Sequence, residues 1–247
     1  MPYLKSEILK SRRSFARALI FLAPAVTVLL SALAPQWFEI SSMNLWYAFL
    51  HPGFLSLLCV SIEQRDGDGL QYRTVFPLPV SLSGIWLAKI GTAALYVLLG
   101  NLVFFALNLL GGFLVAWLFG QSVMLGVSRA LPGIVCLVAA SLWELPLCLY
   151  LARKTGPVFT LLVNAGVGSA LGVVAAPSSL WFLCPYSWAP RLMIPILRIL
   201  PNGTLADGSA PPTPGAAIAA VLAAALVLFV SLSRLTAKRF AGKEAAG

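Results

Sequence analysis

Apolar residues of this 247-residue chain gather into six long runs that are separated by short polar segments. A hydrocarbon core of about 30 Å needs roughly 20 helical residues to cross it, and each run meets or approaches that length. The pattern therefore predicts an all-α polytopic membrane protein with six transmembrane helices in a single domain, residues 1–247. The predicted spans are Ala18–Ala34, Leu45–Ile62, Ile85–Phe119, Leu131–Leu151, Pro157–Ala176 and Ala216–Leu235.

The third run is too long for one upright crossing. At about 1.5 Å per residue, a helix of this length would span roughly 50 Å. The segment Asn108-Leu-Leu-Gly-Gly is a weak turn signal, which argues against two crossings. We interpret the run as one helix that is tilted, extends beyond the bilayer, or bends at Gly111-Gly112.

Composition and charge support this interpretation. Hydrophobic residues make up 60% of the chain and charged residues only 10%, whereas a soluble domain has about a quarter charged. A soluble fold could not hide this much apolar surface while presenting so few charges to water. The net charge of +9 is divided among short segments rather than one stripe, so it does not indicate nucleic-acid binding.

The distribution of Lys and Arg sets the orientation. With six spans, fourteen of the 17 basic residues fall on one side, and only Arg129, Arg191 and Arg198 fall on the other. Cytoplasmic loops carry this excess, so both termini are predicted to be cytoplasmic. Five or seven spans would scatter the charges over both sides, which also favours six.

The segment before the first span is predicted to be amphipathic. Leu4, Ile8 and Phe15 recur at helical spacing within residues 1–16, and basic residues surround them. This pattern is typical of a short helix lying at the cytoplasmic membrane surface. The alternative is an ordinary basic tail that only sets the topology.

The external segment 177–214 is too long for a simple turn. Its aromatic residues, among them Tyr186 and Trp188, favour the membrane interface. The stretch Arg191–Leu200, which prolines bound, is predicted to form short helical pieces, and Asn202 lies in a predicted turn.

The cytoplasmic loop 63–84 begins with a polar, flexible stretch and continues into apolar residues bounded by prolines. Ser81 and Ser83 then suggest a short capped element before the third span. Such a compact, partly apolar element could dock into a partner protein; the alternative is a plain connecting loop. The residues concerned are Phe76, Pro77, Leu78, Pro79, Val80 and Ser81.

No catalytic signature is present: the sequence lacks a phosphate-binding loop, a His-Glu-x-x-His zinc motif and a Gly-x-Ser-x-Gly nucleophile motif. Glu144 is the strongest single candidate for a functional residue, because placing a carboxylate inside the membrane costs free energy. It either contacts a cationic substrate or makes a structural hydrogen bond near Pro146. Asn101 and Asn164 are further candidates for the substrate path, although interhelical hydrogen bonds also explain them. His51 and the four cysteines are interpreted as structural rather than metal-binding.

Several blocks of sequence resemble one family. The blocks are Phe76-Pro-Leu-Pro-Val-Ser, Leu142-Trp-Glu-Leu-Pro-Leu, Pro185-Tyr-Ser-Trp-Ala-Pro-Arg-Leu-Met and Ile199-Leu-Pro-Asn-Gly. In this order they are similar to the lantibiotic-immunity ABC transporter permeases of the MutE/EpiE type, which belong to the type-2 ABC exporters. The resemblance extends over nearly the whole chain.

The resemblance implies a permease subunit in the bacterial plasma membrane that expels cationic lantibiotic peptides and so confers producer immunity. It implies a second permease subunit and a separate ATPase subunit, with ATP and Mg bound by the ATPase and no cofactor bound by this chain. It also implies a role for each predicted feature: a connecting helix in 1–16, a coupling element around Phe76–Ser81, and re-entrant helices in 177–214 at the exit.

Other functions remain open at this stage. A related exporter could move drugs or lipids instead of lantibiotics. A membrane sensor or assembly subunit would transport nothing, and a membrane-embedded enzyme would need motifs that the sequence lacks.

Overall fold

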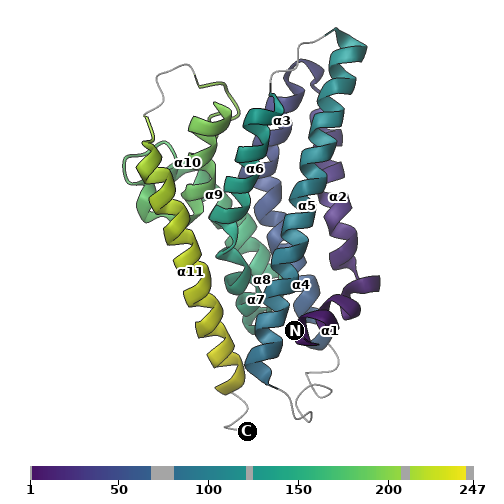
Figure 1. The fold of residues 1–247 in the computed structure, drawn as a ribbon, viewed down its shortest axis with the longest axis vertical. Helices are drawn as coiled ribbons and strands as arrows, with labels where there is room; N and C mark the ends of the chain where they lie inside the picture. The colour runs from purple at the N-terminus through teal and green to yellow at the C-terminus, as the bar shows by residue number, and fades with distance from the viewer. Residues whose placement is uncertain (1, 68–80, 121–124, 207–211, 243–247) are drawn as a thin grey trace.

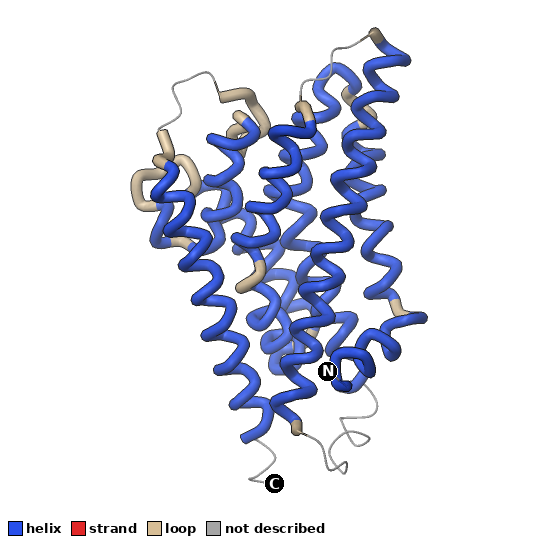
Figure 2. The backbone as a smooth tube through the Cα atoms, viewed as in Figure 1, coloured by secondary structure: helices blue, strands red, loops and turns tan. Residues whose placement is uncertain are grey.

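The computed structural model describes residues 2–67, 81–120, 125–206 and 212–242. Within these ranges the chain is a bundle of helices, and the sole extended pairing is an isolated antiparallel bridge between Ile199 and Leu205 (Figure 2). The predicted all-α class is confirmed.

The elements follow the six predicted apolar runs (Figure 1). Four helical stretches are long and apolar enough to cross a membrane, and the number becomes six when each of two bent helix pairs is taken as one span. The spans are α2 (Phe15–Ser31), α3–η3–α4 (Phe38–Leu45, Trp46–Leu50, His51–Gly67), α5 (Leu82–Phe119), α6–α7 (Val127–Ser141, Glu144–Thr155), α8–η4–α9 (Pro157–Leu161, Leu162–Gly168, Ser169–Ala175) and α11 (Gly215–Gly242).

Both ends of the chain lie at the same end of the bundle (Figure 1). This is what an even number of spans requires, and it agrees with the topology predicted from Lys and Arg. We call this end cytoplasmic and the opposite end external.

The N-terminal segment is a helix that turns away from the first span. Helix α1 (Pro2–Lys10) and a 3₁₀ turn, η1 (Ser11–Arg13), precede α2, and the axes of α1 and α2 differ by 69°. Leu4 and Ile8 are half-buried against the bundle, whereas Lys5 is exposed. The predicted amphipathic helix is therefore present, at the cytoplasmic end of the bundle (Figure 1).

The second span starts earlier than predicted, because its polar residues are satisfied by packing. The pattern placed the start at Leu45, but a 3₁₀ turn, η2 (Pro35–Trp37), and α3 extend it outward. Buried Glu39 accepts a hydrogen bond from the Leu125 N–H at 2.9 Å. The Asn108 side chain donates to the Ser42 hydroxyl. A hydropathy pattern alone does not reveal hydrogen-bond partners inside the bundle.

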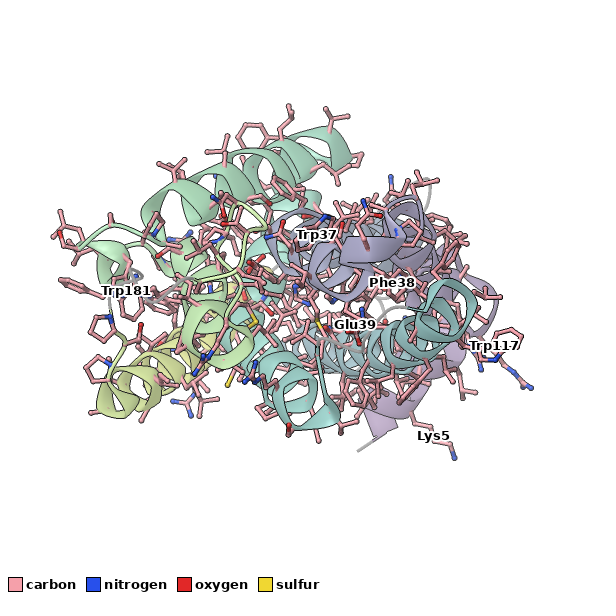
Figure 3. The ribbon with its side chains drawn as sticks, turned by 90° about the horizontal axis from the view of Figure 1, so that it is seen from above. Lys5, Trp37, Phe38, Glu39, Trp117 and Trp181 are labelled. Carbon is pink, nitrogen blue, oxygen red and sulfur yellow. The ribbon has the colours of Figure 1, made fainter. Side chains whose placement is uncertain are left out.

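Helix α5 is continuous over 38 residues, so the prediction of one helix in the third run is confirmed. The pair Gly111-Gly112 lies inside α5 and provides space for α3: a Cβ on Gly112 would lie 2.7 Å from Glu39 Oε1, and one on Gly111 would collide with the Phe38 ring. Figure 3 shows Phe38 and Glu39 beside α5, with Trp117 projecting from the rim of the bundle. The glycines are a site of close helix packing.

The fourth span is broken at Leu142-Trp143, where α6 and α7 meet at 46°. Pro146 has no N–H to donate to the carbonyl of Leu142 four residues earlier. That carbonyl accepts instead from the Leu145 N–H at 3.1 Å, in a tighter turn. The break places Glu144 at the start of a new helix, in the interior of the bundle.

The external segment contains a 3₁₀ turn, η5 (Trp181–Leu183), and a helix, α10 (Pro185–Leu197). Short helices were predicted here, but the sequence pattern started them at Arg191, after Pro190. The helix begins six residues earlier because Pro185 occupies its first turn, where no N–H is needed. Pro190 and Pro195 are accommodated inside it.

Candidate functional site

An intramembrane cluster of polar side chains lies where the second, fourth and fifth spans meet. Asn164 donates to Glu144 Oε2 at 2.8 Å, to Ser56 Oγ at 3.2 Å and to the Pro52 carbonyl at 3.3 Å. Glu144 is 5% exposed and Asn164 is fully buried. The sequence candidates Glu144 and Asn164 are thus brought into direct contact, by a hydrogen bond between helices rather than one near Pro146.

Irregular helical turns form the walls of this cluster. Asn164 belongs to η4, a π-helical turn, and η3, a second π-helical turn, immediately precedes His51 in the neighbouring span. Pro52 contributes to the irregularity because it cannot donate to the carbonyl of Ala48. Such π-turns are frequent at functional sites.

Asn101 belongs to a separate but adjoining group. Its Oδ1 accepts from Trp46 Nε1 at 3.0 Å, and its Nδ2 lies 3.1 Å from His51 Nε2. The Trp46 ring stacks on Phe104 with ring centroids 4.7 Å apart. His51, 1% exposed, is therefore a buried structural residue in contact with Asn101.

A narrow cavity separates the two groups. Its walls include His51, Glu144, Ser169 and Tyr186, and it is about the size of one water molecule. The Ser169 and Tyr186 hydroxyls have no hydrogen-bond partner among the described residues. A water molecule is stable where two to four polar groups surround it, and this cavity meets that condition.

Tyr186 comes from the external helix α10, so this helix reaches the intramembrane cluster. A Cβ on Gly168 would lie 2.5 Å from Tyr186 Cε1, and one on Gly172 would lie 2.6 Å from the Tyr186 carbonyl oxygen. The Tyr186 ring also meets the Trp143 ring edge-on, with centroids 4.9 Å apart. These two glycines allow α10 to lie directly on the fifth span.

The other external candidates hold α10 in place rather than line the cavity. Trp188 Nε1 donates to the Phe182 carbonyl at 3.0 Å. Arg191 donates to the Ala176 carbonyl and to Thr213 Oγ1, each at 3.1 Å. Asn202 Oδ1 accepts from the Thr204 N–H at 3.1 Å, which confirms the predicted turn.

A second polar group, the cytoplasmic ion cluster, was not predicted. Lys89 is completely buried and lies 3.1 Å from Glu63 Oε2 and 3.0 Å from Asp66 Oδ2. Lys10 of α1 lies 2.7 Å from Glu7 and 3.4 Å from Asp66. Burial by itself disfavours the Lys10 ammonium, but Glu7 and then Asp66 outweigh burial and raise the pKa of Lys10.

This cluster corrects the predicted loop 63–84. Residues Glu63 to Gly67 form the end of α4 instead of a flexible stretch, because Lys89 pairs with their carboxylates. Ser81 and Ser83 were predicted to cap a short element before the third span, but Ser81 is the N-cap of α5 itself, which starts at Leu82: its Oγ accepts from the Gly84 N–H at 3.2 Å. The Ser81 N–H donates to Tyr3 of α1. The predicted coupling residues Phe76, Pro77, Leu78, Pro79 and Val80 lie outside the described residues.

A weak signal for this cluster was present in the sequence. Lys89 interrupts an apolar run, and Glu63 and Asp66 lie three residues apart, on one helix face. The pairing across 26 residues depends on how α4 and α5 pack. Within the described residues, no group of three or more His, Cys, Asp or Glu side chains could hold a metal ion.

A bundle of apolar helices long enough to span a membrane, with a short external helix and a buried polar cluster, defines a polytopic membrane protein. The chain matches the model of the ABC-2 family transporter proteins over residues 3–172, which is more than half of its length. It therefore belongs to this family and is the membrane subunit of an ABC transporter. The comparison with curated proteins found no match, and neither did the comparison with solved structures.

Proposed function

We propose that this chain is the permease of an ABC exporter that expels cationic lantibiotic peptides from the bacterial plasma membrane and protects the producing cell. A separate ATPase subunit binds ATP and Mg, and a second permease, identical or homologous, completes the pathway. Family membership supports the exporter class. The sequence blocks described above favour the lantibiotic substrate.

One observation carries the mechanism: Tyr186 of the external helix and the buried Glu144 border the same cavity. A displacement of α10 at the external face therefore changes the surroundings of a carboxylate inside the membrane. A cationic group of the substrate is attracted to that carboxylate, because an unpaired charge inside a membrane is costly. We propose that α10 opens this region outward during export.

The cytoplasmic ion cluster supplies the other half of the mechanism. It joins α1, the end of α4 and the first turns of α5 through Lys10, Asp66 and Lys89. In the proposed cycle, ATP binding closes the ATPase subunits, which pull on the coupling element Phe76–Ser81. The paired charges transmit this force to α4 and α5 together, and the bundle tilts between inward-open and outward-open states.

A growth assay tests the substrate. The chain is expressed with its ATPase and second permease in a sensitive host, and inhibitory concentrations are measured for lantibiotics, uncharged drugs and membrane-active lipids. We expect protection against at least one cationic lantibiotic, and none when the ATPase carries an inactivating substitution in its phosphate-binding loop. Protection against only drugs or lipids would replace the lantibiotic proposal with the related exporter function.

Co-purification tests the partners. We expect affinity-tagged permease to bring down the ATPase, and we expect replacement of Phe76 and Leu78 by Asp to abolish this while the permease still inserts. The matched control introduces two Asp residues at the exposed external positions Leu180 and Leu183. An intact permease that never retains an ATPase would instead indicate a sensor or assembly subunit.

A further inference from the structure

The bend between α1 and α2 forms a basic groove at the cytoplasmic end of the bundle. It has a volume of about 630 Å³, and Leu9, Lys10, Arg12 and Arg17 line it. This volume is within the usual range for small-ligand sites. The bend between α1 and α2 lies on the far side of the bundle from α10 (Figure 1), and the residues that line the groove are not shared with the intramembrane cavity.

Two of these cations are available to a ligand. The side chains of Arg12 and Arg17 are exposed, and neither forms an ion pair with an acidic group among the described residues. Lys10 is held at the edge of the groove by Glu7 and Asp66. Because Lys10 and Lys89 already neutralise those carboxylates, the lining of the groove remains positive.

Apolar side chains flank the basic ones. Leu9 and Phe15 are 58% and 55% exposed, although they lie beside charged residues. Arg17 and Phe21 are four residues apart, so they share a face of α2 with Phe21 about 6 Å deeper in the bilayer. Phe21 is 60% exposed. A ligand here meets cations at the level of the headgroups and an apolar surface at the level of the acyl chains.

We propose that this groove binds an anionic phospholipid of the cytoplasmic leaflet, with the headgroup phosphate on Arg12 and Arg17 and an acyl chain along Phe21. Arginine suits phosphate because its planar guanidinium makes two parallel hydrogen bonds. A free phosphate or an acidic protein surface would leave the apolar flank exposed. Through Lys10, a bound lipid contacts the same ion cluster that joins α1, α4 and α5.

Lipid retention tests the proposal. Purified protein is reconstituted in nanodiscs of phosphatidylcholine with phosphatidylglycerol, released into detergent and analysed by native mass spectrometry. We expect retained phosphatidylglycerol on the wild type and about tenfold or more weaker retention on Arg12→Gln/Arg17→Gln, since each basic residue near an anionic surface contributes several-fold to binding. The matched control, Arg234→Gln/Lys238→Gln, removes two exposed basic residues of α11 and is expected to retain the lipid.

Thermal stability measurements then distinguish a phospholipid from free phosphate as the ligand. In detergent, phosphatidylglycerol is expected to raise the thermal midpoint of the wild type and of the control pair, but not of the Arg12→Gln/Arg17→Gln protein. Inorganic phosphate is expected to have no such effect. The proposal is overturned if both double variants lose phosphatidylglycerol equally, or if inorganic phosphate stabilises the wild type as much as phosphatidylglycerol does. It is also overturned if the Arg12→Gln/Arg17→Gln protein retains all of its lipid but no longer co-purifies with the ATPase.

Discussion

The cytoplasmic ion cluster and the intramembrane cluster stabilise their buried carboxylates in different ways. In the cytoplasmic ion cluster, Glu63 and Asp66 meet the opposite charge of Lys89 at 3.1 and 3.0 Å. In the intramembrane cluster, the described partner of Glu144 is the neutral amide of Asn164 at 2.8 Å. A paired charge is committed to its partner, whereas a carboxylate held by a dipole keeps the capacity to attract a cation.

This difference suits the two positions. At the cytoplasmic end, ion pairs join α1, α4 and α5, which move as a unit in the proposed cycle. Inside the bundle, a carboxylate beside a small cavity can accept a passing cationic group without first breaking an ion pair. Three substitutions test the comparison, in order of the expected effect on stability.

The largest effect is expected for Lys89→Met. It removes the buried ammonium that pairs with Glu63 and Asp66, and removal of one partner of a buried ion pair typically costs about 3–5 kcal/mol. Denaturation in mixed micelles of dodecyl sulfate measures the free energy of unfolding. The exposed substitution Lys5→Met is the control, and Lys89→Met/Glu63→Gln/Asp66→Asn is expected to recover most of the loss. A triple variant as unstable as the single one would show that packing of the Lys89 stem dominates.

An intermediate effect is expected for Asn164→Leu. This substitution removes the N–H donor of Glu144 and of Ser56, and a buried group left unsatisfied costs about 1–3 kcal/mol. The same denaturation assay applies. Because Asn164→Leu/Glu144→Met removes both partners, it is expected to be more stable than the sum of the single changes. Strict additivity would mean that the two side chains do not stabilise each other.

The smallest effect on stability is expected for Glu144→Gln, because the new carbonyl oxygen still accepts from Asn164. We expect less than about 1 kcal/mol of destabilisation, together with reduced protection against cationic lantibiotics in the growth assay. Glu39→Gln is a matched control: it also removes a buried acid and keeps an acceptor for the Leu125 N–H. Equal loss of protection in both variants would remove the special role of Glu144.

Much of the fold was predictable because the bilayer imposes a strong rule on sequence. The third, fifth and sixth apolar runs correspond closely to α5, α8–α9 and α11. The N-cap at Ser81 and the turn at Asn202 were also predictable, since each depends on neighbouring residues. Two errors lie at the start of the second span and the end of α4, where polar residues continue a helix because distant partners satisfy them, and a third lies at the start of α10, which begins at Pro185.

The candidate site was predictable only as separate residues. Glu144 and Asn164 stood out as polar groups in apolar runs, but nothing in the sequence related Tyr186 to them across an intervening external turn. In the sequence, nothing distinguishes Gly168 and Gly172 from other small residues. In the structure, their lack of a Cβ allows α10 to approach the fifth span.

The sequence by itself indicated the all-α membrane class, predicted six spans with both termini cytoplasmic, and identified the buried acid at position 144, because hydropathy and the distribution of Lys and Arg are local properties. The tertiary structure decided which buried groups meet: Lys89 with Glu63 and Asp66, and Glu144 with Asn164 beside Tyr186. Hydroxyl groups such as those of Thr27 and Ser56 bond to carbonyls of their own helix, whereas Lys89 and Glu144 find their partners on other helices. Helix packing fixes those partners, and with them whether a buried carboxylate pairs with a cation or lies beside a small cavity.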